Sequence, residues 1–487
     1  MTDFQGDKIC TFLGATFAYM ARSYPYVLLL LILSVIGLFY LNWYGDRPLF
    51  LDEANVVRNL FDRSYTELFQ PLDHEQYAPP MFLVWAKLCA EGFGYLEQGI
   101  RYALFSSVLL ILLGLLLSAK ALKLEVWTLL PIAALAMNGL ALRYFIEIKP
   151  YGFDLGVAAF LLAVFLKRNK PDVLVALVGA LAPWVSLPSI FVLASGGLWT
   201  FFRRNQTTKT RLKWLSTAVF WLSSFGLLYY LTLRHSLSES SLTDYHQAYF
   251  FPVTSATGGI DLNATFELLY QLIKAPFGHT VLSISSGMTL ALYGWFTATE
   301  RKGWLLAGPL LLAVIFSAGA YYSLIPRLLL FTFPGWWLGA ALGARRLYHK
   351  GGKMQWLAIG LAVASISGVD WPNHFRPVAY SDSRQLVTTY DSNYLPVLDG
   401  LSFPGFDYYH RVHPFGDGLP DHALVTDDYT GNLRYVRLYD VLTSEASQQS
   451  LRQEEMRATA RGCKVRLVEQ FRAAALYVDC SSEMKPF

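Results

Sequence analysis

The chain has 487 residues, of which 54% are hydrophobic and only 16% are charged. Soluble domains usually carry about 25% charged residues, and the mean hydropathy of +0.34 adds to the contrast, so the composition excludes a soluble globular protein. The net charge of +4 is carried largely by loops between apolar stretches. It therefore reflects membrane topology and gives no reason to expect nucleic acid as a partner.

Apolar stretches close to the roughly 20 residues that span a bilayer recur along residues 1–370. We therefore predict an all-α polytopic membrane domain with about eleven transmembrane helices over this range. Pro183 and Pro188 break the pair between residues 173 and 202 into short halves. The predicted helices are 25–44, 99–119, 126–142, 151–166, 173–186, 187–202, 214–233, 280–298, 304–321, 324–342 and 355–370.

Lysines and arginines set the predicted orientation, because they gather in alternate loops, as is typical of cytoplasmic loops. These loops are residues 120–123, 167–170, 203–213, 301–302 and 345–353. The N-terminus is therefore expected in the cytoplasm, and the long loops 45–98 and 234–279 on the outer face together with the C-terminal segment. Residues 1–22 lack the pattern of a cleavable signal peptide, so we expect the first helix to be an uncleaved anchor.

The outer loops have helical periodicity of their own. Residues 52–61, 79–93 and 264–276 are predicted as helices that lie at the outer interface of the membrane. The second of them is apolar enough to cross the bilayer. Counting it as a span would invert every later loop and place the basic cluster 203–213 outside, so we predict a juxtamembrane helix there.

Residues 371–487 have the composition of a small soluble domain, predicted as an α/β fold on the outer side. The segments VRLVEQF and AALYVD predict two strands around a turn near Arg472 and Ala473. Cys463 and Cys480 flank this hairpin, so a disulfide between them is expected in an oxidising compartment. Two independent buried thiols are the alternative.

Two polar groups lie in the first outer loop. Asp52 and Glu53 open a helix just after the first span, where the functional interpretation is a general base and the structural one is an N-cap with an acidic first turn. The second group contains His74 and Gln76 and ends in Pro79 and Pro80. It suits a sugar or phosphate pocket, although a proline pair also starts a helix without any function.

Two further groups lie at outer helix ends. Glu147 and Lys149 lie in a turn between two spans, where an ion pair with snorkelling bases is the structural alternative. Tyr322 and Arg327 precede a later span, where the arginine either anchors the helix or binds a lipid phosphate. All four groups fall on the same predicted face, and charged residues beside a membrane are functional candidates by default.

The order of these motifs resembles a family. An Asp52-Glu53 pair after the first helix, an Ala-Pro-Pro segment at residues 78–80 and Glu147-x-Lys149-Pro-Tyr are similar to the GT-C glycosyltransferases. Within that superfamily, the chain resembles in particular the bacterial relatives of protein O-mannosyltransferases and of the lipid A aminoarabinose transferase. The resemblance covers roughly residues 25–340, and each motif is short.

The resemblance implies a multi-pass enzyme of the bacterial cytoplasmic membrane that takes a sugar from a polyprenyl-phosphate donor. The acceptor would be a glycan, lipid or protein on the outer face, and membrane lipids would surround the enzyme. Asp52 would deprotonate the acceptor hydroxyl in an inverting displacement, with Glu53 and Glu147 as further catalytic carboxylates. Arg327, Lys149 and His74 would stabilise the leaving phosphate, with Gln76 and Tyr322 also binding the donor.

The sequence departs from the aminoarabinose transferase at one motif. Where that enzyme has Glu-Lys-Pro, this chain has Tyr77-Ala78-Pro79, so the phosphate contact must come from elsewhere or the donor differs. The alternative function is a non-catalytic transporter, flippase or assembly subunit for lipid-linked glycans. A transporter would carry charged sites near the bilayer midplane, whereas the groups here lie at helix ends. The sequence leaves open whether Mg²⁺ or Mn²⁺ takes part.

Overall fold

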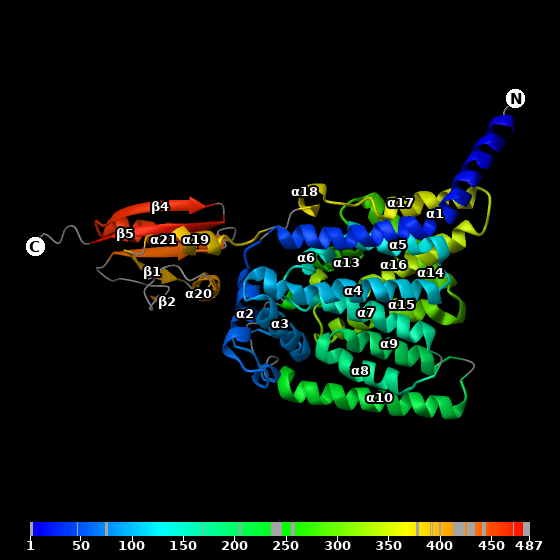
Figure 1. Ribbon diagram of the computed structural model, residues 1–487, viewed down its shortest axis with the longest axis horizontal. Coiled ribbons are helices and arrows are strands. Elements are labelled where there is room, and N and C mark those ends of the chain that lie inside the picture. Colours follow the sequence, from blue (N-terminus) through cyan, green and yellow to red (C-terminus); the bar gives the residue numbers. More distant parts are fainter. Residues whose placement is uncertain are drawn as a thin grey trace, which may run out of the picture.

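The computed structural model describes most of the chain. The described residues are 3–45, 47–73, 76–168, 170–203, 206–234, 246–254, 259–375, 379–389, 391, 393–398, 401–412, 424–425, 434–440, 445–470 and 472–480. They form a bundle of roughly parallel and antiparallel helices with a small sheet region at one end (Figure 1). The chain is thus a mostly helical membrane protein, as its composition predicts.

Each predicted span has a helical counterpart in the bundle. The first and longest helix begins well before the predicted span, and two predicted spans consist of consecutive shorter helices. The elements are α1 (Asp3–Tyr44), α4 (Glu97–Ala121), η2 (Glu125–Thr128) with α5 (Leu129–Met137) and α6 (Gly139–Tyr144), α7 (Tyr151–Lys167), α8 (Val173–Val185), α9 (Ser189–Phe201), α10 (Thr208–Leu228) with η3 (Tyr229–Leu233), α14 (Val281–Thr297), η4 (Thr299–Arg301) with α15 (Lys302–Ala318), η5 (Pro326–Thr332) with α16 (Phe333–Tyr348) and α17 (Lys353–Ser365).

Helix length separates these elements into two kinds. Within the described residues, four helices are long and apolar enough to cross a membrane: Tyr24–Tyr44, Glu97–Ala121, Thr208–Leu233 and Thr299–Ala318. Other predicted spans are shorter because local chemistry interrupts them. Asn138 caps α6 by accepting the N–H of Ala141 and thereby separates α6 from α5. Pro188 follows the end of α8, where a proline ring disfavours continued helix.

Small residues bring the helices of the bundle close together. α14 and α16 meet at glycines, because a Cβ atom at Gly294 would lie 2.0 Å from the carbonyl oxygen of Gly339, and one at Gly343 would lie 2.0 Å from that of Leu290. Gly339 and Gly343 form a GxxxG pair, the spacing that lets two membrane helices approach at backbone distance. This close packing compensates for the absence of a hydrophobic driving force between helices in lipid.

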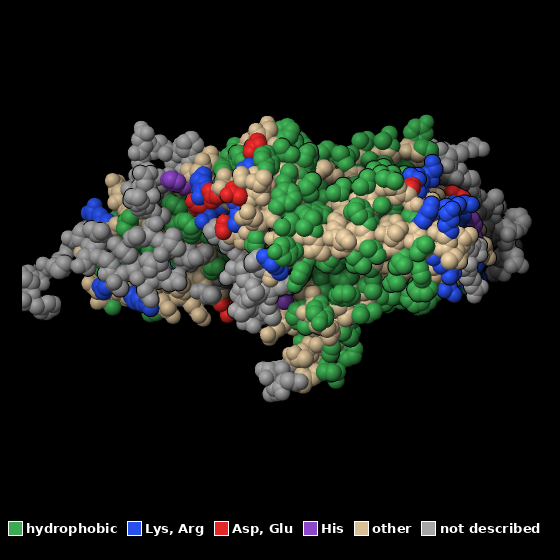
Figure 2. All heavy atoms as spheres, turned by 90° about the horizontal axis from the view of Figure 1, so that it is seen from below, with side chains coloured by type: hydrophobic (Ala, Val, Ile, Leu, Met, Phe, Trp, Pro, Cys, Tyr) green, Lys and Arg blue, Asp and Glu red, His purple; other side chains and the backbone are tan. Residues whose placement is uncertain are grey.

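The two ends of the bundle differ in charge. Hydrophobic side chains cover the middle of the face in Figure 2, and Lys and Arg side chains gather at the end away from the sheet region. At that end Arg203 pairs with Glu300 at 2.6 Å, and Arg345 lies 3.8 Å from Glu125. These pairs join loops that the sequence assigns to one side of the membrane, so the basic loops meet on one face.

Three shorter helices correspond to the predicted juxtamembrane segments. They are α2 (Leu51–Asp62), α3 (Pro80–Phe93) and α13 (Leu262–Phe277), with a short 3-10 turn η1 (Glu67–Phe69) between the first two. Figure 1 shows α2 and α3 at the end of the bundle that faces the sheet region. The loop at residues 45–98 therefore lies between the two parts of the molecule.

In the described residues of the C-terminal sheet region there are five strands and three helices. The strand order is β2-β1-β3-β5-β4, with β1 parallel to β2 and β3, and β5 antiparallel to β3 and β4. The elements are α19 (Ser383–Thr389), β1 (Leu395–Leu398), α20 (Phe403–Val412), β2 (Leu424–Val425), β3 (Tyr435–Tyr439), α21 (Glu445–Ala460), β4 (Lys464–Gln470) and β5 (Ala473–Asp479), preceded by the short α18 (Trp371–His374).

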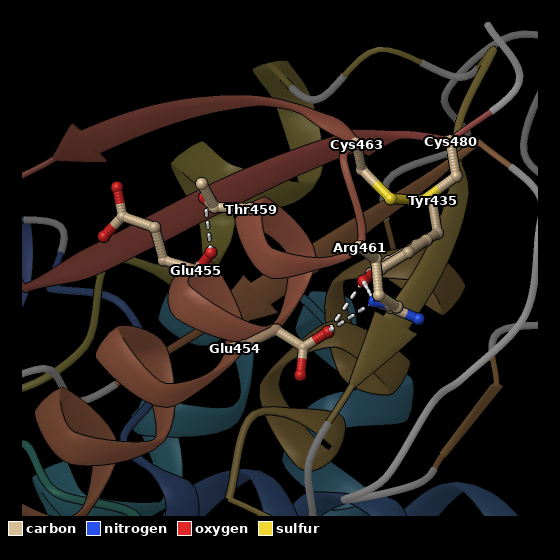
Figure 3. The surroundings of a disulfide bond; sticks show 7 residues. All are labelled: Tyr435, Glu454, Glu455, Thr459, Arg461, Cys463 and Cys480. Carbon is tan, nitrogen blue, oxygen red and sulfur yellow. Dashed lines mark hydrogen bonds and ion pairs between the residues drawn. A yellow bond between two sulfur atoms is a disulfide. The ribbon is translucent and has the colours of Figure 1, made fainter. Parts of the chain in front are cut away.

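The predicted hairpin corresponds to β4 and β5, and Cys463 and Cys480 form a disulfide at its open end (Figure 3). Beneath the disulfide, the Tyr435 hydroxyl donates to Glu454 at 2.7 Å and accepts from Arg461 at 2.9 Å. Arg461 also lies 3.7 Å from the Glu454 carboxylate. The polar group joins α21 to β3, the middle strand of the sheet, and the disulfide closes the hairpin three residues after the end of α21.

Candidate active site

Among the described residues of the loop 45–98, Glu53 is the most enclosed carboxylate, with no exposed surface. Its Oε2 lies 2.5 Å from Nη2 of Arg47 and accepts the Phe50 N–H at 3.1 Å. Its Oε1 accepts the Ile148 N–H at 2.9 Å and lies 3.7 Å from Nη2 of Arg101. Burial alone would raise the pKa of Glu53, but the two arginines and the two backbone N–H groups hold it below its ordinary value.

These contacts predict that Glu53→Gln destabilises the protein. The change removes the negative charge and leaves Arg47 and Arg101 buried without it, which costs about 3–5 kcal/mol. Because the folded-state pKa of Glu53 is depressed, its stabilisation is complete above its unfolded-state pKa and is lost as the pH falls through the folded-state value. Thermal unfolding of purified protein in detergent, measured at neutral and acidic pH, tests the loss of stability in the variant and the pH dependence of the wild type. Equal stability of variant and wild type at neutral pH would contradict the prediction.

Glu147 belongs to the same buried charge network and is only 3% exposed. Its Oε2 accepts from Nε of Arg143 at 2.9 Å and lies 3.7 Å from Nη1 of Arg47. Arg47 therefore connects Glu53, near the start of α2, to the turn before α7. This network fixes the position of α2 on the bundle.

Asp52 is the accessible carboxylate of the pair, with a side chain that is 35% exposed. Its Oδ2 lies 4.0 Å from Nζ of Lys149, which in turn donates to Oε1 of Gln76 at 2.7 Å. Lys149 is nearly buried, and burial lowers its pKa although the charges of Asp52 and Glu147 oppose the shift. The site thus combines one partly exposed carboxylate with one enclosed cation.

Arg327 adds a second positive charge. It lies on η5, and its charge acts on Lys149 and on His246 of the second outer loop. Tyr322 has a different place: its hydroxyl donates to the Leu328 carbonyl at 2.7 Å. Tyr322 therefore holds the start of η5, which carries Arg327. His74, the remaining candidate from the sequence, lies outside the described residues.

A buried polar cluster adjoins this site. Asp154 lies one turn into α7 and is 3% exposed, and the hydroxyls of Ser186 and Ser189 at the α8–α9 break are fully buried. Ser186 lies beside Asp154, and Tyr77 lies beside Thr232 and within range of the Asp154 charge. Within the described part of the chain, the hydroxyl of Ser189 has no hydrogen-bond partner, whereas Asp154 pairs with Ser186 and Tyr77 with Thr232.

Sequence reasoning missed this cluster and two of the arginines. Asp154 and Arg101 lie inside predicted membrane spans, where an ionisable residue is itself a signal of function or of a buried partner. Arg47 precedes the Asp52-Glu53 pair by only a few residues, yet no local pattern assigns it to a carboxylate. As for metals, the described residues contain no group of three or more His, Cys, Asp or Glu that could hold an ion.

The helical bundle, the juxtamembrane helices and the charged site at one end of the bundle define a mostly helical integral membrane protein. Its fold is that of ArnT. The crystal structure of ArnT from Cupriavidus metallidurans bound to undecaprenyl phosphate matches with a TM-score of 0.56 and 12% identity, over 92% of this chain and 97% of that one. The apo crystal structure matches with a TM-score of 0.56 and 12% identity, over 93% and 98%. No protein-family model and no curated protein matches the sequence.

Proposed function

We propose that this protein is a glycosyltransferase that moves a sugar from a polyprenyl-phosphate-linked donor to an acceptor hydroxyl on the outer face of the membrane. The partly exposed carboxylate of Asp52 lies 4.0 Å from the enclosed Lys149 at the end of the bundle that faces the sheet region, and this pair supports the proposal most directly. The shared fold supports the donor class, because ArnT was crystallised with undecaprenyl phosphate.

The reaction needs a base, a leaving-group stabiliser and a defined geometry. The Asp52 carboxylate takes the proton of the acceptor hydroxyl as its oxygen bonds to the anomeric carbon. The bond between that carbon and the donor phosphate oxygen breaks, and the lipid phosphate leaves with the electron pair. Lys149 and Arg327 stabilise the negative charge that develops on the phosphate. A single displacement of this kind inverts the anomeric configuration.

Accessibility assigns the base among the three candidate carboxylates. A general base must come within hydrogen-bond reach of its substrate, and only Asp52 combines a partly exposed side chain with a cation on one side. Glu53 and Glu147 are enclosed and bound to arginines. We therefore assign positioning roles to Glu53 and Glu147, and donor-binding roles to Lys149 and Gln76.

The cluster around Asp154 suits the hydroxyl-rich ring of the donor sugar. Buried polar atoms nearly always have a hydrogen-bond partner, and a group left without one, such as the Ser189 hydroxyl among the described residues, costs about 1–3 kcal/mol. Sugar hydroxyls can both donate to Asp154 and accept from Ser186 or Ser189. Burial raises the pKa of Tyr77, so that its hydroxyl stays protonated and able to donate.

We predict that Asp154→Asn lowers kcat/KM for the donor by about 10- to 100-fold, since it exchanges an acceptor for a donor at the sugar subsite. Initial rates over a series of donor concentrations measure this ratio. Asp172→Asn is the matched control, because Asp172 caps the far end of α8. An equal effect of both changes would remove Asp154 from the subsite.

The proposed topology follows from the charges. The site lies at the end of the bundle opposite the basic loops, so with those loops in the bacterial cytoplasm the site and the sheet region face outward. Glycan, lipid and protein acceptors all remain compatible with this arrangement. Cysteine labelling with a membrane-impermeant reagent at an exposed position such as Met456, in intact and permeabilised cells, tests it. Labelling only after permeabilisation would reverse the orientation.

The decisive experiment is sugar transfer in membranes. Membranes that contain the wild type or Asp52→Asn at matched expression receive polyprenyl-phosphate donors with different radiolabelled sugars. Transfer by the wild type that is lost in the variant supports the proposal. No transfer from any donor by the wild type would favour a non-catalytic transporter, flippase or assembly subunit for lipid-linked glycans.

A further inference from the structure

The C-terminal sheet region binds directly to the helix that carries Asp52. Nε of Arg58, in the middle of α2, lies 2.6 Å from Oδ2 of Asp407 on α20. Arg411, also on α20, pairs with Asp62 at the end of α2. These contacts join residues about 349 positions apart in sequence. The middle and the end of α2 are therefore attached to the sheet region.

The start of α2 has its own attachment through Tyr409. This residue of α20 has no exposed surface. Its hydroxyl accepts the backbone N–H of Leu49 at 2.8 Å and donates to Oε1 of Glu97 at 2.6 Å. Nε of Arg384, on α19, donates to the same Glu97 oxygen at 3.0 Å. The Tyr409 hydroxyl thus connects Leu49, two residues before α2, to Glu97, the first residue of α4.

The segment before Asp52 is consequently held from two sides. On the bundle side, Glu53 binds Arg47 and the Phe50 N–H of this segment with one oxygen. Its other oxygen accepts the Ile148 N–H at 2.9 Å and lies 3.7 Å from Arg101 of α4. On the side of the sheet region, Tyr409 binds Leu49. Asp52 follows Leu49 by three residues and has no hydrogen bond to either anchor, so its side chain stays available while its backbone is fixed.

We infer that Tyr409 is a positioning residue of the active site, which sets the location of the Asp52 carboxylate through the Leu49 backbone. The inference rests on the proposed function, in which the sheet region would then help to position the catalytic base. Reacting groups must lie within a fraction of an ångström of the productive geometry, and a misplacement of about 1 Å can cost about 10²-fold in rate. The hydroxyl of Tyr409 is the group of the sheet region best placed to prevent such a shift.

The neighbouring Tyr408 supplies a matched control. It lies on the same helix, is equally buried, and its hydroxyl donates to the Tyr95 carbonyl at 2.8 Å. Tyr408→Phe and Tyr409→Phe therefore remove the same group from adjacent buried positions, and both keep the aromatic ring. Only the second change releases the segment before Asp52.

The test measures kcat, KM for the donor and amide hydrogen exchange in full-length protein. Tyr409→Phe is expected to lower kcat by about 10-fold with KM changed less than about 2-fold, while Tyr408→Phe leaves kcat within about 2-fold of the wild type. Peptides that cover residues 48–54 should exchange faster in Tyr409→Phe alone. Adding Tyr409→Phe to Asp52→Asn should cause no further loss, because a misplaced carboxylate no longer matters once it is removed.

Two results would overturn the inference: equal kcat and equal exchange in the two phenylalanine variants, or a loss confined to KM. Failure of the proposed function has a different signature, because Asp52→Asn would then transfer sugar normally or the wild type would not transfer at all. In either case, unchanged exchange over residues 48–54 in Tyr409→Phe would still refute the positioning role.

Discussion

Asp52→Asn is expected to lower kcat for sugar transfer by about 10²- to 10⁴-fold, the range that a positioned general base contributes. Asparagine has nearly the same shape as aspartate but cannot accept the acceptor's proton. Asp52 is partly exposed, and its one ion pair is a 4.0 Å contact with Lys149, so removing its charge should have little effect on folding. Initial rates with saturating donor in detergent or membranes measure the loss.

Asp62→Asn is the control for this prediction. Asp62 lies at the opposite end of α2, where its exposed carboxylate pairs with Arg411, and surface pairs of this kind contribute little to stability. We expect its kcat within about 2-fold of the wild type. Comparable losses in both variants, or a thermal midpoint that falls only in Asp52→Asn, would mean that Asp52 acts through the structure of α2 rather than as the base.

Much of the membrane fold could be predicted because apolar length and charged loops are local properties of the sequence. The two predicted spans at residues 173–202, which contain Pro183 and Pro188, correspond to two short helices, α8 and α9. The juxtamembrane helix at residues 79–93 corresponds to α3, beginning at Pro80. The helical breaks were harder to locate, because the cap that splits α5 from α6 depends on the side-chain geometry of Asn138.

The site could be predicted only as a set of positions. Adjacent residues on a helix point about 100° apart, so the sequence could not say which of Asp52 and Glu53 faces the substrate and which faces the bundle. That choice depends on Arg47, Arg101 and the turn at Ile148, which approach Glu53 from three separate segments.

The contacts of the sheet region had no signal in the sequence. In the sequence, Tyr409 is one of several tyrosines in the C-terminal segment. Its partner Leu49 lies 360 positions away, and a single backbone N–H leaves no pattern in composition or periodicity. Pairings of this kind emerge only when the two segments are folded together.

Lys149→Met is expected to lower kcat by about 10²- to 10³-fold, because it removes the enclosed charge that stabilises the departing phosphate. Lys149→Arg keeps a cation and should recover part of the rate. Since burial lowers the pKa of Lys149, the wild-type rate should begin to fall on the alkaline side below the ordinary lysine value of 10.5. Arginine stays charged at every accessible pH, so this alkaline decline should move upward or vanish in Lys149→Arg.

Lys87→Met separates this electrostatic role from a structural one. Lys87 is also nearly buried, but its Nζ donates to the carbonyls of Leu60 and Arg63 at 2.6 and 2.8 Å, away from Asp52. Its loss should lower the thermal midpoint and leave kcat per folded molecule close to the wild-type value. The electrostatic role of Lys149 would be contradicted if Lys149→Met behaved in the same way, or if Lys149→Arg kept the wild-type alkaline decline in rate. The leaving phosphate would then be stabilised by Arg327 or another cation, and Lys149 would serve to hold Gln76 and α7 in place.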